Sequence, residues 1–235
     1  MSDQGRTSTY ARLFLVWVIL SLAFAIYHSG GSVFSWRLPS EIVCGDAPER
    51  AFICGAFGEK LATAGLICGA SLLLRALALR RAAHSRGLEV RAIASASWLG
   101  LSIALAPCGL FVAGPTASWN SAGLTRRQNG LIALAGPAVS MLLAALFFAV
   151  LSVIMLARIA APPWFPYFGY VGFRFNALLA LWSMVPVERF AGARVLAWSR
   201  GVFFSTAAAA FVLVFVLGDE RVLAWLLRVV TSIEG

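Results

Sequence analysis

The chain has 235 residues, of which 60% are hydrophobic and only 12% are charged, and its mean hydropathy is +0.85. So little polar surface excludes an ordinary soluble globule, and a lipid bilayer is the solvent that fits this composition. The formal net charge of +9 comes mostly from arginines in the short connections between apolar runs. This pattern indicates cytoplasmic loops near anionic lipid headgroups, and not a nucleic-acid partner.

Six apolar runs are long enough, or nearly so, to cross a bilayer. They are Leu13–Tyr27, Leu61–Leu79, Ala92–Ala113, Leu131–Ala157, Phe175–Val187 and Val202–Leu217. None alternates like a barrel strand, and a segment in hydrocarbon must satisfy its own backbone hydrogen bonds. The sequence therefore predicts an all-α polytopic membrane bundle of about five to six transmembrane helices. We expect one multi-pass domain over residues 1–235, in the cell membrane.

Arg6 and Arg12 before the first run, with the small residues Ser29–Ser32 after it, also fit a signal peptide. As a first span, the run would place the N-terminus in the cytoplasm. The stretch 29–60 has no excess of positive charge and is expected to form an outer loop. It contains Cys44 and Cys54. An oxidising exterior would allow a disulfide between them, but the spacing leaves the bridge open.

Arginines cluster after the second run and before the fourth run, which predicts that both connections are cytoplasmic. They are Arg80, Arg81, Arg86, Arg91, Arg126 and Arg127. The chain between them must then leave and return on one side, which a single crossing cannot do. Segment 92–123 is therefore expected to be re-entrant or broken. It either bends back near Pro107 and Gly109 or returns as extended chain through Trp119 and Asn120.

The remaining connections follow from prolines and aromatic residues. Pro162, Pro163 and Pro166 predict an outer loop, with the aromatic residues between Trp164 and Tyr170 at headgroup level. The last full span ends near Gly218. Residues 219–235 are expected to form a short C-terminal helix on the membrane surface.

Two stretches, Leu124–Ser140 and Phe175–Trp198, resemble the site-2 proteases, which are intramembrane zinc metalloproteases; the archaeal branch is the most similar. The first is similar to the family's helix start and Ala-Gly-Pro segment. The second resembles its Asn-rich helix, its Pro turn and its Leu-Asp-Gly motif. The residues that match these structural motifs are Asn129, Gly136, Pro137, Asn176, Pro186 and Gly192. The resemblance implies a site-2-protease-like fold over most of the chain.

In that family, zinc is held by two histidines of a His-Glu-x-x-His segment and by the aspartate of Leu-Asp-Gly, with the glutamate as general base. The corresponding positions here are Ser71, Leu72, Arg75 and Ala191. The sequence has two histidines, His28 and His84, and neither has a Glu or His at helical spacing. The resemblance therefore implies a degenerate member with no catalytic residue, no metal and no cofactor.

Arg75 is a strong charge inside an apolar run, about one turn from the basic end of that run. We expect its side chain to snorkel to the cytoplasmic headgroups. The alternative is that it closes the former metal pocket or pairs with Glu188. Ser71, Ser140 and Ser183 are poor candidate nucleophiles, because no His or Lys lies in a nearby span to act as a base.

The leading functional hypothesis is a pseudoprotease that acts as a helix-binding scaffold or accessory subunit of a larger complex of integral membrane proteins. Ala133, Gly136 and Ser140 share one helix face and would allow close approach of a partner. The alternatives are an active metalloprotease with atypical ligands and a small transporter or channel component. Near-replacement of lysine by arginine, together with the archaeal motifs, suggests a prokaryotic source.

Overall fold

The computed structural model describes residues 3–29, 57–157, 164–187 and 189–218. Its helices are α1 (Asp3–His28), α3 (Phe57–His84), α4 (Ala96–Leu105), α5 (Arg126–Leu156), α6 (Trp164–Ser183), α7 (Ala191–Trp198) and α8 (Arg200–Phe211), with a 3-10 turn at Ala106–Cys108 and a π-helical turn at Val212–Val216. Two short strands are β1 (Val90–Ala92) and β2 (Ala117–Trp119). Three expectations concern residues outside the described ranges. They are the disulfide left open between Cys44 and Cys54, the surface helix at 219–235 and the alternative pairing of Arg75 with Glu188.

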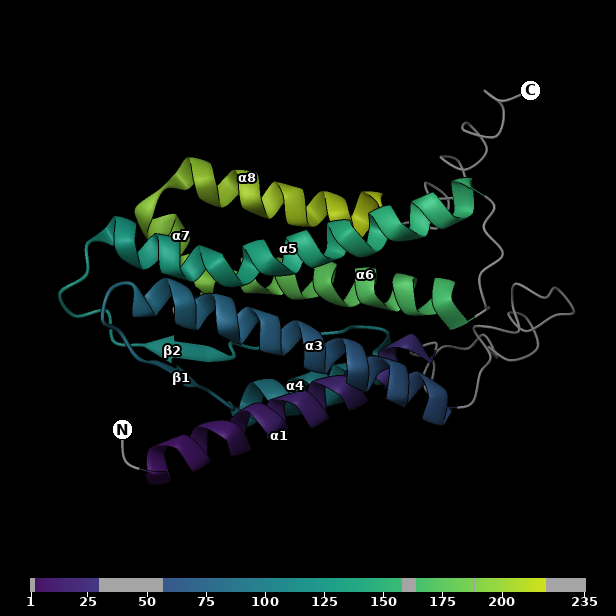
Figure 1. Cartoon of the computed structure of the whole chain (residues 1–235), viewed down its shortest axis with the longest axis horizontal. Helices are drawn as coiled ribbons and strands as arrows, with labels where there is room; N and C mark the ends of the chain where they lie inside the picture. Colours follow the sequence, from purple (N-terminus) through teal and green to yellow (C-terminus); the bar gives the residue numbers. More distant parts are fainter. Residues whose placement is uncertain (1–2, 30–56, 158–163, 188, 219–235) are drawn as a thin grey trace, which may run out of the picture.

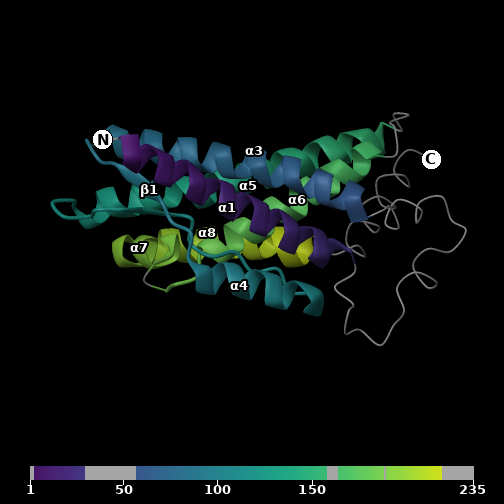
Figure 2. The same cartoon turned by 90° about the horizontal axis from the view of Figure 1, so that it is seen from below.

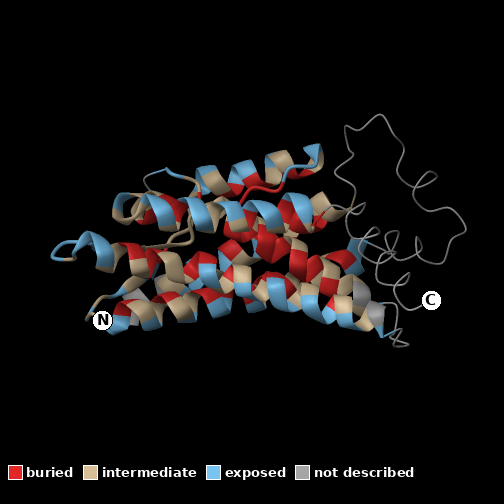
Figure 3. Ribbon diagram, turned by 90° about the horizontal axis from the view of Figure 1, so that it is seen from above, coloured by how far each residue is buried: buried red, intermediate tan, exposed pale blue. Residues whose placement is uncertain are grey.

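The long helices lie side by side along the longest axis of the molecule (Figure 1). Helix α5 is central and packs against α3, α6 and α7, whereas α1 packs against α3 and α4. Figure 2 shows α4 and α8 on the side of the bundle away from α3. Buried residues lie between the helices and exposed ones cover the outer faces (Figure 3). The outer faces nevertheless include large apolar side chains such as Leu66 and Leu142, as expected where lipid is the solvent.

Three of the described helices are long and apolar enough to cross a membrane: Thr9–His28, Phe57–His84 and Arg126–Ile154. Two shorter apolar helices are Ala96–Cys108 and Arg200–Val216. The mostly helical architecture and these spans are features of a membrane protein. The count of five to six spans and the placement of the N-terminus stay predictions.

Two helices begin earlier than the apolar runs suggested. Helix α3 begins at Phe57, so the predicted outer loop 29–60 overlaps its first turn. Helix α6 begins at Trp164, so the aromatic residues that we assigned to an outer loop are helical, and Arg174 lies inside the helix. One Arg174 nitrogen donates to the Tyr27 hydroxyl (2.9 Å) and the other to the Gly218 carbonyl (3.1 Å). Sequence reasoning missed this charge because the apolar run begins at the next residue.

Segment 92–123 reverses direction. After α4 and the 3-10 turn, Gly109 adopts the left-handed conformation with φ of 75°, which a residue without a Cβ adopts at little cost. The chain then returns in extended form, and β2 pairs antiparallel with β1 in the register Val90↔Trp119 and Ala92↔Ala117. Strands of three residues are too short to show an alternating pattern, so this departure from an all-α chain was not predicted.

Hydrogen bonds and rings hold the returning chain against the bundle. The Ser102 hydroxyl donates to the Val112 carbonyl (2.5 Å), and the Trp182 indole N–H donates to the Phe111 carbonyl (2.6 Å). The Phe111 ring meets Phe24 edge-on, with the ring centroids 5.0 Å apart. These contacts join the returning chain to α4, α6 and α1, and they place the residues before β2 beside α3 and α5.

Candidate functional site

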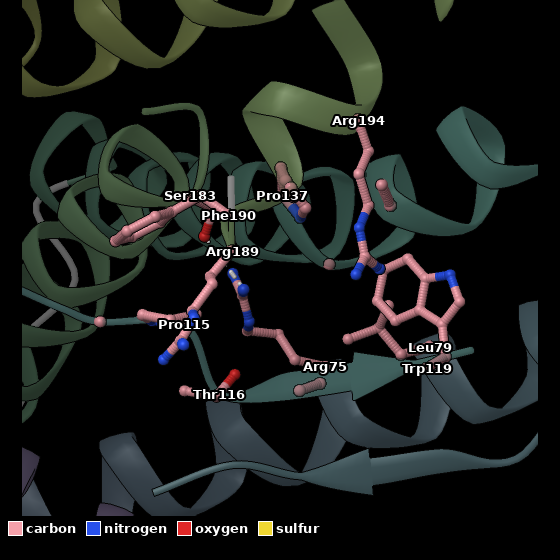
Figure 4. Close-up of a pocket in the computed structure, with 15 residues that line it drawn as sticks. Arg75, Leu79, Pro115, Thr116, Trp119, Pro137, Ser183, Arg189, Phe190 and Arg194 are labelled. Carbon is pink, nitrogen blue, oxygen red and sulfur yellow. Dashed lines mark hydrogen bonds between the residues drawn. The ribbon is translucent and has the colours of Figure 1, made fainter. Parts of the chain in front are cut away.

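A small pocket lies where α3, α5, α7 and the chain at β2 converge (Figure 4). Its volume is about 30 Å³. Three guanidinium groups, from Arg75, Arg189 and Arg194, line it. Ala191 lines it as well, so two of the four positions that the resemblance assigns to the zinc site, Arg75 and Ala191, share one pocket although they are far apart in the sequence.

Arg75 is buried on α3, with 7% of its surface exposed. Its Nη1 donates to the Ser140 hydroxyl of α5 (2.7 Å), and its Nη2 donates to the Ser183 hydroxyl of α6 (3.0 Å). The prediction that this side chain snorkels to the headgroups is therefore wrong. Two hydroxyls from neighbouring helices hold the guanidinium inside the bundle, where it lines the pocket.

Ser140 and Ser183 are thus occupied as hydrogen-bond acceptors. The Ser183 hydroxyl also donates to the Leu179 carbonyl one turn earlier (2.5 Å). A nucleophilic serine needs a neighbour that accepts its proton, and a guanidinium has only donors and keeps its own proton in proteins. The contacts of both hydroxyls suit the placement of a buried cation and not nucleophilic attack.

Helix α5 supplies the wall opposite α3. Its start is fixed by a capping box, in which the Gln128 amide donates to the Thr125 hydroxyl (3.2 Å) and the Gln128 side chain accepts from the Thr125 amide (3.0 Å). A Cβ added to Gly136 would lie 3.2 Å from Arg75 Nη2. The close approach that we expected at Ala133, Gly136 and Ser140 is made by Arg75 and helix α3 of the same chain. The expected partner would therefore have to bind elsewhere.

Helix α7 brings Ala191, the position that the resemblance assigns to the third zinc ligand, into the pocket. Ala191 and Arg194 lie three residues apart and share one face of the helix. The Arg194 guanidinium lies over the Trp119 ring, 3.8 Å from the ring centroid, and burial lowers the pKa of Arg194 below its ordinary value. The Trp119 indole N–H in turn donates to Asn129 Oδ1 (2.9 Å). Asn129, which the sequence motif identified, therefore orients a ring of the site.

Other predicted residues lie outside the pocket lining. Ser71 and Leu72 are buried on α3, where Leu72 belongs to the core shared with α1. Asn176 is fully buried and donates from Nδ2 to the Gly172 carbonyl (2.9 Å), but its Oδ1 has no partner in the described part of the chain. Pro186 is exposed between α6 and α7.

The sequence motifs did not identify Arg189 and Arg194 as site residues, because the resemblance assigns a role only to Ala191 and Gly192 in this part of the chain. The available signal was helical spacing from Ala191: a residue three positions later faces the same way. Pro137, which matches the Ala-Gly-Pro motif, does line the pocket, and its missing N–H leaves one hydrogen bond of α5 unmade.

Over 77 residues, 32% of this chain, the sequence is 40% identical to a protein of Methanocaldococcus jannaschii provisionally named a zinc metalloprotease. That stretch is 37% of the relative, so the match spans little more than a third of it. No protein-family model matches the chain, and no solved structure does. The likeness loosely supports a relationship to zinc metalloproteases of the site-2 kind.

Proposed function

We propose that this chain is a catalytically inactive relative of the site-2 proteases that binds a segment of another integral membrane protein, as an accessory subunit of a hetero-oligomeric complex. The observation that supports the loss of catalysis is the buried Arg75 guanidinium, held by Ser140 and Ser183 in the pocket that Ala191 also lines. A fixed cation stands beside the position where the resemblance would place the metal.

The residues at this pocket do not fit zinc. Protein ligands of zinc are thiolates, neutral imidazoles and carboxylates. The positions that the resemblance assigns to ligands hold a hydroxyl at Ser71, a guanidinium at Arg75 and a methyl group at Ala191. Three arginines line the pocket and would repel a divalent cation. Among the described residues, no three His, Cys, Asp or Glu side chains are grouped so that they could hold a metal ion.

Among the described residues β2 pairs with no strand other than β1, and its second edge supports the other half of the proposal, the binding of a partner segment. The Ile93 amide donates to the Thr116 carbonyl (3.0 Å), so in the observed register Ala117 and Trp119 are non-hydrogen-bonded positions. Their amide and carbonyl groups therefore point away from β1. An extended segment can add to such an edge through main-chain hydrogen bonds. Since Ala117 and Trp119 also line the pocket, the bound segment would lie beside it.

The metal content of the purified protein tests the inactive half of the proposal. We expect no stoichiometric zinc by mass spectrometry after purification in mild detergent with zinc in all buffers, because the arginines leave no ligand set. The variant Arg75→His/Ala191→Asp exchanges the cation for two zinc donors in the same pocket and serves as the matched comparison. One zinc per wild-type chain, removed by a chelator together with a proteolytic activity, would contradict the proposal.

A photo-crosslinking residue at the exposed position Asn120, directly after β2, tests the partner half. We expect a discrete adduct with one membrane protein in native membranes. The adduct should be lost in Ala117→Pro, which removes the outward amide donor, and kept in Ala117→Val, which retains it. The same crosslinker at Leu142 on the outer face of α5 controls for random encounters in the membrane. An adduct that survives Ala117→Pro would exclude edge-strand binding.

A further inference from the structure

The pocket described above collects positive charge without a matching negative charge. Arg75 reaches it from α3, Arg194 from α7 and Arg189 from the loop before α7 (Figure 4). Within the described part of the chain, none of the residues that line it is acidic. Like charges gathered at a partly buried site raise the free energy of the folded state unless a counter-charge joins them.

Two of these arginines also have unused hydrogen-bond donors. Nη1 and Nη2 of Arg75 donate hydrogen bonds to two serine hydroxyls. Its Nε is buried and has no partner in the described part of the chain. Arg194 stacks on Trp119, and its Nη1 is likewise buried without a partner there. Buried donors in native proteins are almost always paired. Unpaired donors on two guanidinium groups at one pocket therefore indicate an acceptor that is supplied from elsewhere.

The size of the pocket limits which chemical group could accept hydrogen bonds from these arginines. A volume of about 30 Å³ has room for about two groups of the size of a water molecule. A carboxylate presents two oxygens in one plane and matches the fork of a guanidinium, whereas a phosphate presents four oxygens and is bulkier. Thr116 also lines the pocket, and its hydroxyl could donate a further hydrogen bond to a carboxylate.

We propose that this pocket is a binding site for a carboxylate group, with Arg75 and Arg194 as its main donors and Arg189 at its exposed mouth. The carboxylate has two possible sources: a small soluble acid, or an acidic side chain of the membrane segment that binds beside β2. The second source rests on the proposed function. The binding of a small acid does not, so the two ideas can fail separately.

The test follows thermal unfolding of the purified protein in non-ionic detergent while sodium formate replaces sodium chloride at constant ionic strength. A ligand that binds only the folded state raises the unfolding temperature in a saturable way, and we expect this for formate. Arg194→Gln should weaken the apparent affinity about tenfold or more, because a charge-assisted hydrogen bond is lost. Arg127→Gln, an exposed arginine outside the pocket, should change nothing. Arg189→Gln provides a second pocket variant if Arg194→Gln does not fold.

Two blocked amino acids separate the sources. If N-acetyl-glutamate amide binds more tightly than formate, and its neutral isostere N-acetyl-glutamine amide does not bind, the carboxylate comes from an acidic side chain. Equal affinities for formate and the blocked glutamate point to a soluble acid. No saturable effect of formate, or an effect that the arginine variants leave unchanged, overturns the proposal. Tighter binding of inorganic phosphate also overturns it, as does a formate response that appears only in Glu188→Gln, since the chain would then supply its own carboxylate.

Discussion

Replacement of both hydroxyls that hold Arg75, in the variant Ser140→Ala/Ser183→Ala, is expected to lower the free energy of unfolding by about 3 kcal/mol, since each hydrogen bond to a charged donor is worth about 1.5 kcal/mol or more. Arg75 is 7% exposed, and its guanidinium would keep its charge after losing both acceptors, which is the costly way to break a buried polar contact. Unfolding in mixed micelles, followed by circular dichroism as dodecyl sulfate is added, measures the change.

The control is a double-mutant cycle with Arg75→Leu. Once the charge is gone, the two serine changes should cost less than about 1 kcal/mol, because no donor is left without an acceptor. Arg75→Leu itself should be tolerated better than the loss of the serines, since well-packed apolar residues often replace buried ionic groups without loss of stability. Equal costs of the serine changes in both backgrounds would show that Arg75 does not depend on these hydroxyls.

In the inactive protease relative that we propose, a cation other than a metal joins the helices. A metal centre joins several helices through one cation and its ligands. In this chain the Arg75 cation on α3 likewise joins α5 and α6, through one hydroxyl on each. We propose that the arginine took over this structural role, while the capacity to activate water, which requires a bound metal and a positioned base, was lost.

The long helices could be predicted from the sequence because apolar composition in lipid leaves few alternatives. The runs beginning at Leu13, Leu61 and Leu131 each correspond to a long helix, although the helix bounds extend past the runs at polar ends. The meeting of positions 75 and 191 followed from the resemblance and not from periodicity. No local sequence pattern could have predicted that residues on α3 and α7 line the same pocket.

Other features could not be predicted because they depend on tertiary contacts. Whether Arg75 reaches the headgroups or turns inward depends on the two serines, which lie on other helices. The helical position of Arg174 was not predicted, because the apolar run starts one residue later. Its acceptors at Tyr27 and Gly218 are far away in the sequence. The strands β1 and β2 are too short to show a period, and they pair after the chain between them, which includes the left-handed Gly109, reverses direction.

Gly192→Ala is expected to be the most damaging single substitution near the pocket. Gly192 is buried at the start of α7. A Cβ there would overlap the main-chain carbonyl group of Met184 and lie 2.7 Å from the Val185 carbonyl oxygen. Main-chain atoms at the end of α6 cannot rotate away as a side chain can, so α7 must move. We expect a loss of about 3 kcal/mol or more in the free energy of unfolding, at the upper end of the range for overpacked sites.

The displacement of α7 should be visible at Trp119, because Arg194 lies over its ring at 3.8 Å. In Gly192→Ala, the stacking should be lost and formate should no longer stabilise the protein. Gly65→Ala is the matched control: that glycine also lies in a helix, but an added Cβ would meet nothing within 4 Å, and alanine favours the helix by about 1 kcal/mol. If Gly192→Ala were as stable as Gly65→Ala, the close approach of α7 to the end of α6 would be wrong, and with it the shared pocket of Arg75 and Ala191.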